Sequence, residues 1–174
     1  MDTDNDPNTS PLHAAPHGVF PVDRPVEALI RDHDLVRQLA DHYRNSGSLE
    51  VKKQAARQIL QALHTHSRVE ESVFYPAVRN LEPSLIGHFE QDHLKVDDLL
   101  ATLQGMPLND AHSEQLMRQL IDLAVQHMQE EEQQLFPRLA QAQMDMTSIG
   151  LEMAALEANL IHMQAQASAA PARR

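Results

Sequence analysis

Apolar residues recur at intervals of three and four positions along most of this chain, which is the period of an amphipathic α-helix. The pattern predicts five helices, each with one apolar stripe, and Asp23 is the expected N-cap of the first. Short stretches rich in Gly, Asn, Ser or Pro separate them, so consecutive helices are expected to be antiparallel neighbours. The predicted helices cover about 23–44, 49–79, 83–104, 113–142 and 147–163.

This arrangement predicts an all-α fold, an up-down-up-down antiparallel four-helix bundle with an additional C-terminal helix. Pro76 lies near the end of the second helix and lacks a backbone donor, so we expect a kink or break just before it. Pro137 occupies the same place in the fourth helix. The predicted organisation is a disordered leader over 1–22, the bundle over 23–142, the C-terminal helix packed on the bundle over 143–163 and a disordered tail over 164–174.

Composition narrows the expected partners. The formal net charge is -11, so no basic face is available to neutralise nucleic acid or an anionic membrane surface. No stretch approaches the roughly 20 apolar residues that span a bilayer, and the N-terminus lacks the features of a signal peptide. We therefore expect a soluble, cytoplasmic protein. Cysteine is absent, so histidine and carboxylate side chains must carry any metal chemistry.

One polar pattern occurs twice in the chain, starting at His66 and again at His127. Each copy has a His, a Glu four positions on, a second Glu, an apolar or aromatic stretch, and then Pro. Another histidine precedes each copy at nearly the same distance, His33 for the first and His93 for the second, and each follows an aspartate. The repeat indicates two similar helical hairpins that present the same side chains to a shared centre.

Residues four positions apart lie on one face of a helix, so His66 points with Glu70 and His127 points with Glu131. An imidazole can bind one metal ion while the carboxylate one turn away bridges to a second. Helical bundles hold such two-metal sites through inward-facing side chains. A donor set of nitrogen and oxygen suits iron, with manganese or zinc as alternatives. The predicted ligands are His33, His66, Glu70, His93, His127 and Glu131.

The pattern leaves open the roles of several other polar residues near it. Glu71 and Glu132 point about 140° away from the preceding ligand histidine on an α-helix, so they are expected to support the site from outside it or to lie on the surface. Glu90 is an alternative seventh ligand. Asp97 is either a supporting partner or a surface charge. The remaining histidines, His13, His17, His42, His64, His88, His112 and His162, are expected in the leader, on the surface or in structural positions.

The order His, His-x3-Glu, His, His-x3-Glu, with its Glu-Glu and aromatic-Pro continuation, resembles the hemerythrin-like HHE cation-binding domain over about Val26 to Leu139. The resemblance implies a non-haem centre of two iron ions, with an oxo or hydroxo bridge. It implies the six residues named above as ligands, with Glu70 and Glu131 as bridging carboxylates.

Two departures separate this chain from the oxygen-carrying hemerythrins. Phe89 stands where they have a fifth histidine, and Glu131 replaces an aspartate one position further on. Simple reversible oxygen storage is therefore disfavoured. The expected function is binding or reaction with dioxygen, peroxide or nitric oxide, in oxygen or redox sensing or a stress response. Alternatives are a di-iron enzyme with peroxide-consuming or oxidase activity, and an iron-centre repair or metal-dependent regulatory protein. The sequence assigns no catalytic residue and no protein partner.

Overall fold

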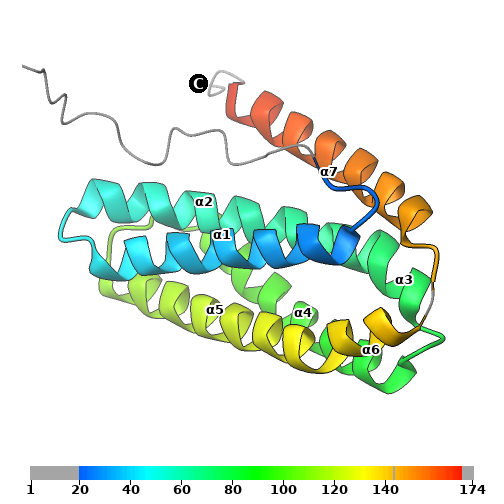
Figure 1. Cartoon of the computed structure of the whole chain (residues 1–174). Coiled ribbons are helices and arrows are strands. Elements are labelled where there is room, and N and C mark those ends of the chain that lie inside the picture. Colours follow the sequence, from blue (N-terminus) through cyan, green and yellow to red (C-terminus); the bar gives the residue numbers. More distant parts are fainter. Residues whose placement is uncertain (1–19, 143, 170–174) are drawn as a thin grey trace, which may run out of the picture.

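The computed structural model describes residues 20–142 and 144–169 of the chain, and all the regular elements in them are helical (Figure 1). Four long helices form the predicted bundle. Each hairpin pairs its own two helices, α1 with α2 and α4 with α5, and contacts between α1 and α5 and between α2 and α4 close the ring. These helices are α1 (Pro25–Asn45), α2 (Leu49–Val69), α4 (Pro83–Gln104) and α5 (Ala111–Glu130).

Local chemistry sets where these helices begin. Helix α1 starts at Pro25, whose missing N–H would have no partner in the first turn. The predicted N-cap at Asp23 is wrong, because Arg24 is the N-cap and no side chain caps that end. Helix α5 starts two residues before the predicted position. Its N-cap Asp110 accepts a hydrogen bond from the Ser113 N–H at 2.8 Å, and the Ser113 hydroxyl oxygen accepts one from the Asp110 N–H at 3.2 Å.

The second and fourth predicted helices widen into another type of helical turn just before their prolines, where a kink or break was expected. A π-helical turn, η2 (Glu70–Phe74), follows α2 and leads into α3 (Tyr75–Val78). Its counterpart η3 (Glu131–Leu135) leads from α5 into α6 (Phe136–Gln141). In both, the N–H that closes the turn reaches back five residues, from Tyr75 to the Glu70 carbonyl in η2. The wider turn removes the clash that a proline ring makes with the carbonyl four residues before it.

The apolar core of the bundle divides into two clusters, and the ligand histidines lie between them. On α1, His33 separates Leu29 of one cluster from Val36 of the other. The first cluster fills the half of the bundle that contains the α1–α2 turn, and the second fills the half that contains the prolines. The largest side chains buried in these clusters are Tyr75, Phe74, Phe89, Leu29, Ile59, Leu63, Ile86, Leu103, Met117, Leu120, Ile121 and Met128.

Helix α7 (Met146–Ala169) packs outside the bundle against α1, α2 and η2 (Figure 1). It buries Met153, and it passes so close to the leader that a Cβ on Gly150 would lie 2.0 Å from the carbonyl oxygen of Val22. The helix runs on to Ala169, so the predicted end at 163 was too early. Gln164 lies on the bundle, with its side-chain amide 3.0 Å from the Thr65 hydroxyl, and continues the helix there.

Residues 1–19 of the predicted leader and 170–174 of the predicted tail lie outside the described residues. Residues 164–169, expected in a disordered tail, belong to α7 instead. Among the described helices, none is both long enough and apolar enough to cross a membrane.

Candidate metal centre

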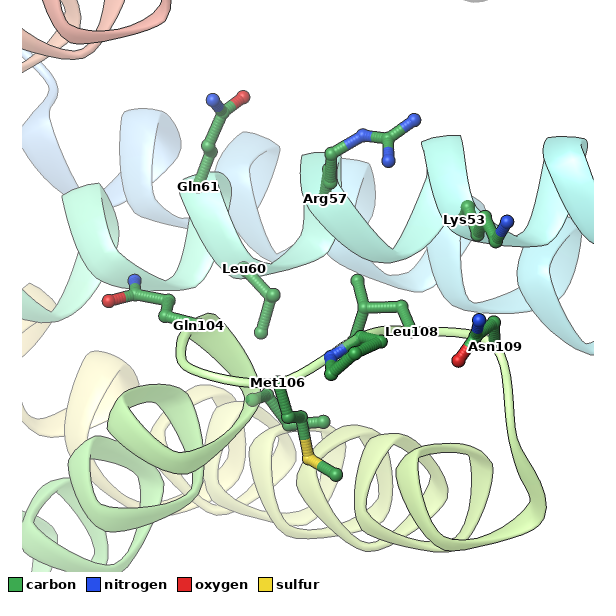
Figure 2. A pocket seen from close by; sticks show the side chains of 10 residues that line it. Lys53, Arg57, Leu60, Gln61, Gln104, Met106, Leu108 and Asn109 are labelled. Atoms are coloured by element: carbon green, nitrogen blue, oxygen red, sulfur yellow. The ribbon is translucent and has the colours of Figure 1, made fainter. Parts of the chain in front are cut away.

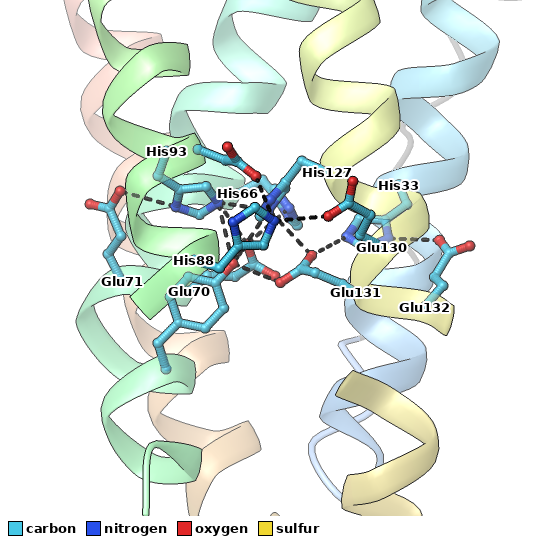
Figure 3. A network of polar contacts seen from close by, with 12 residues as sticks. His33, His66, Glu70, Glu71, His88, His93, His127, Glu130, Glu131 and Glu132 are labelled. Atoms are coloured by element: carbon cyan, nitrogen blue, oxygen red, sulfur yellow. Dashed lines mark hydrogen bonds and ion pairs between the residues drawn. The ribbon is translucent and has the colours of Figure 1, made fainter. Parts of the chain in front are cut away.

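Six buried side chains meet in the middle of the bundle, between the two apolar clusters (Figure 3). The four histidines come one from each long helix, and the two glutamates are the first residues of the two π-helical turns. None of the six is more than 3% exposed. All six residues predicted from the sequence repeat are brought together: His33, His66, Glu70, His93, His127 and Glu131.

These side chains form two overlapping sets of possible metal ligands. In each set, one nitrogen or oxygen atom per residue lies within 4.8 Å of all the others. The first set is His33, His66, Glu70 and Glu131, and the second is Glu70, His93 and His127. Glu70 belongs to both sets, so its carboxylate joins them.

Each glutamate connects an imidazole of its own helix with one from the other hairpin. The Oε2 of Glu70 lies 3.1 Å from the Nε2 of His66 and 3.3 Å from the Nε2 of His93. The corresponding oxygen of Glu131 lies 3.4 Å from the Nε2 of His33 and 3.5 Å from that of His127. The two carboxylates therefore cross-link the hairpins at the level of the site.

Tyr75 adds a hydroxyl group to the centre that sequence analysis did not identify. Its hydroxyl donates a hydrogen bond to the Oε1 of Glu131 at 2.6 Å, and it lies 3.3 Å from the Oε2 of Glu70. The Nε2 atoms of His93 and His127 are each 3.3 Å from the hydroxyl oxygen of Tyr75. Burial first, and then the charges of Glu131 and Glu70, raise the pKa of Tyr75 well above its usual value. Its hydroxyl therefore stays protonated and acts as a hydrogen-bond donor.

The π-helical turn explains why Tyr75 faces the centre. In an α-helix a residue five positions on points about 140° away, so Tyr75 would diverge from Glu70. The extra residue in η2 brings Tyr75 back toward the face of Glu70. The same turn in the second repeat directs Phe136 to the centre, where its ring stacks on His33 at 5.9 Å between centroids. The two halves of the site therefore differ, because one has a hydroxyl where the other has a phenyl ring.

Two further carboxylates hold the outer nitrogens of the upstream histidines. The Nδ1 of His33 is 2.7 Å from the Oε1 of Glu132, and that of His93 is 3.0 Å from the Oε1 of Glu71. Each contact joins the two hairpins. A carboxylate on Nδ1 fixes the tautomer with its proton there and leaves Nε2 free to bind a metal. Sequence analysis left these glutamates between a supporting and a surface role, and the contacts favour support.

The charges at the centre depend on these contacts. Burial acts to lower the pKa of His33, but the neighbouring carboxylates of Glu131 and Glu132 outweigh it and raise that pKa to about 9. Burial likewise acts to lower the pKa of His93, but the hydrogen bonds that its imidazole donates to Glu70 and Glu71 outweigh burial and raise that pKa to about 10. Without a metal, both imidazoles are therefore protonated and positively charged at neutral pH, and their charges offset those of the buried carboxylates. A cation that binds the centre must displace these protons.

Several buried atoms at the centre make no hydrogen bond, which tests whether the site fits a cation. They include the Nε2 atoms of His33 and His66, the Oε1 of Glu70 and the Oε2 of Glu131. A buried polar atom that makes no hydrogen bond costs about 1–3 kcal/mol, more when it is charged. All four atoms belong to the predicted ligands and lie in the first of the two sets. A metal ion bound at the centre would give these atoms a partner, so the residues present fit a metal ion.

Three other residues considered from the sequence lie outside both sets. Phe89 is fully buried and contacts the ring of His127, with centroids 5.4 Å apart. Glu90, the alternative seventh ligand, pairs with Arg79. Asp97 pairs with Arg68, which also contacts Glu71, so it supports the centre only through that arginine.

A surface cavity of about 540 Å³ lies at the far end of the bundle, between α2 and the connection from α4 to α5 (Figure 2). Lys53 and Arg57 line its rim, and Leu60, Leu103 and Met106 form part of its apolar wall. None of the predicted ligands lines it, so this cavity is separate from the centre.

Comparison with known proteins identifies the fold and the family. The sequence profile of the hemerythrin HHE cation binding domain matches residues 24–139, and it also matches 84–172, a register that begins in the second hairpin. The crystal structure of a hemerythrin HHE cation binding domain-containing protein from Mycobacterium kansasii superposes with a TM-score of 0.70. That match has 22% sequence identity and covers 84% of this chain and 93% of the other. Among curated proteins, none matches. This chain belongs to the hemerythrin HHE cation binding domain family.

Proposed function

We propose that the centre binds two iron ions and that the iron-loaded protein binds or reacts with dioxygen, peroxide or nitric oxide. The observation that carries the proposal is the pair of overlapping ligand sets that share Glu70, together with the buried atoms there that make no hydrogen bond. Nitrogen and oxygen donors suit iron, with manganese or zinc as alternatives. Iron supplies redox chemistry and coordination positions that protein ligands do not fill. We place this role in the cytoplasm, in oxygen or redox sensing or in a stress response.

The surroundings of the centre favour small ligands. All six predicted ligands are almost fully buried, and apolar clusters close the bundle on both sides of them. Phe89 places a phenyl ring against His127, where a further imidazole would occupy a coordination position. Small, weakly polar molecules can enter such a site, whereas larger substrates have no room.

Peroxide consumption is the second candidate, and Tyr75 is the observation that favours it. Its buried hydroxyl lies within hydrogen-bond distance of side chains from both ligand sets. A hydroxyl that stays protonated can donate a hydrogen bond to a peroxide that enters the centre and stabilise negative charge that develops on its oxygen atoms. Steady peroxide turnover by the iron-loaded protein would support this activity, and an absence of turnover would exclude it.

Metal content tests the site. The variants His66→Ala and His127→Ala each remove one predicted ligand, one from each set. The matched control is His162→Ala, an exposed histidine on α7 whose ring contacts Gln166. After loading with ferrous iron without oxygen, we expect about two irons in the wild type and in the control, and fewer in both other variants. If both site variants keep the wild-type content, the site assignment is wrong.

Absorbance tests the chemistry of the loaded protein. Ferrous protein prepared under nitrogen is exposed to oxygen, and the oxygen is then removed. A new charge-transfer band that disappears on removal indicates reversible binding, as in a carrier or oxygen sensor. A band that persists indicates oxidation, which favours peroxide or nitric oxide chemistry or redox sensing. If neither oxygen, peroxide nor nitric oxide changes the spectrum, the proposed reactivity is wrong.

A further inference from the structure

A second group of possible metal ligands lies outside the centre, on the surface between α4 and α5. The Nε2 of His88 lies 2.9 Å from the Oε2 of Glu130 and 3.4 Å from the Oδ2 of Asp92 (Figure 3). These three atoms lie within 4.8 Å of one another. The side chain of His88 is 50% exposed, whereas that of Asp92 is 9% exposed. The group therefore opens to solvent at His88 and is buried at Asp92.

The contacts around this group orient both carboxylates toward His88. Lys95 donates a hydrogen bond to the Oδ1 of Asp92 at 2.7 Å, and the Gln126 amide donates one to the Oε1 of Glu130 at 2.9 Å. Each carboxylate therefore has one oxygen held by a neighbouring donor and the other turned toward His88. Outer contacts of this kind fix the ligands of metal sites.

The spacing on α4 repeats the spacing of the central ligands. His88 and Asp92 are four positions apart on one face of the helix, as are His66 and Glu70 in the centre. One imidazole and two carboxylates from two helices form a three-ligand set that leaves positions open to water. Zinc accepts this combination of nitrogen and oxygen donors.

The second hairpin alone carries this group, so it is not a by-product of the internal repeat. At the corresponding positions of the first hairpin, Ala28 replaces His88 and Val69 replaces Glu130. Both of those residues are buried, and α7 packs over that side of the bundle. Among the described helices, α7 packs against α1 and α2 and leaves the side of α4 and α5 that carries His88 uncovered, and His88 itself is half exposed.

We propose that His88, Asp92 and Glu130 form a surface site for a divalent cation of the zinc class, which links α4 to α5. The site lies beside the central one along the chain, because Asp92 precedes His93 and Glu130 precedes Glu131. Adjacent residues on a helix point about 100° apart, so the two sites face different directions. A cation bound here stabilises the contact between the two helices that carry His93 and His127. The surface site does not require iron in the centre.

Zinc titration tests the proposal on the purified full-length protein. The metal content of the centre is measured first, and Zn²⁺ is then added at about pH 7. The variant is His88→Ala, and His162→Ala is again the matched control because it removes another exposed histidine. We expect the wild type and the control to bind one more Zn²⁺ than His88→Ala. We also expect Glu130→Gln to weaken that binding by about tenfold or more.

The centre is followed separately, so failure here is distinguishable from failure of the proposed function. All variants should retain the helical circular dichroism and the iron content of the wild type. Zinc binding by His88→Ala with the same number and affinity as the wild type would overturn the proposal. A loss of central iron in His88→Ala would also overturn it, because the three residues would then support the centre.

Discussion

His33 and Glu132 lie 99 residues apart in sequence, yet the Nδ1 of His33 donates a hydrogen bond to the Oε1 of Glu132 at 2.7 Å. The same glutamate accepts a hydrogen bond from Arg37 at 2.8 Å, which fixes its carboxylate. We predict that Glu132→Gln lowers iron affinity by about 10- to 100-fold, because the neutral amide holds the imidazole less firmly and makes its nitrogen less basic. Iron release to a chelator measures this change.

The control for that experiment is Glu152→Gln, which removes an exposed carboxylate on α7 and should leave the release rate unchanged. Glu71→Gln should resemble Glu132→Gln, since Glu71 holds His93 in the same way. If Glu132→Gln and Glu152→Gln release iron equally fast, the contact does not position His33.

Tyr75→Phe removes one hydroxyl and leaves the aromatic ring in place. We predict that iron content stays close to that of the wild type, because none of the six predicted ligands changes. The rate of reaction with peroxide should fall by about 10²-fold or more, since a positioned hydrogen-bond donor is lost. Stopped-flow absorbance measures the rate. Tyr43→Phe is the matched control, because Tyr43 is buried in the first apolar cluster away from the centre.

An equal rate in Tyr75→Phe and Tyr43→Phe would show that the hydroxyl takes no part in the reaction. A loss of iron in Tyr75→Phe alone would instead show that the hydroxyl is needed to hold the metal.

The sequence predicted the four-helix bundle and the six residues that meet in its centre, and both for the same reason. Helical spacing fixes which side chains share a face, so His66 and Glu70 point together wherever the helix runs regularly. The repeat then placed His33 and His93 in equivalent positions. The structure and the family match confirm the fold.

Helical spacing does not predict the positions of side chains that depend on an irregular backbone or on packing between the two hairpins. Tyr75 faces the centre because η2 is a π-helical turn, and the α-helical period directs it elsewhere. The pairing of His33 with Glu132 depends on how the two hairpins pack, and spacing along one helix carries no information about it. Pro76 and Pro137 did mark the irregular turns, although the expectation of a kink or break did not specify a π-helical turn.

Phe89→His restores an imidazole one turn before His93, where oxygen-carrying relatives have their fifth histidine. Phe89 is fully buried between Tyr75 and His127, so a smaller polar ring should cost about 1–3 kcal/mol in the free energy of unfolding. We predict that the added ligand slows the reaction with peroxide. Chemical denaturation and stopped-flow absorbance measure the two effects, and a faster peroxide reaction would contradict the prediction.

The metal-free protein should lose stability as the pH rises above neutral. The pKa values of His33 and His93 are about 9 and about 10 in the folded protein, against 6.5 for an ordinary histidine. A raised pKa contributes stability that is fully present below pH 6.5 and is lost as the pH rises through the folded value. We therefore predict that the free energy of unfolding falls by a few kcal/mol between about pH 6.5 and pH 10.

Denaturant titrations of the metal-free protein at several pH values measure this fall, and iron-loaded protein provides the comparison. Bound iron takes the place of the protons on His33 and His93, so the loaded protein should show a much smaller fall over the same range. Loading at neutral pH should also release protons, which a pH indicator in weak buffer detects. A metal-free protein whose stability is constant or rises between those pH values would show that the two imidazoles do not carry the buried charge.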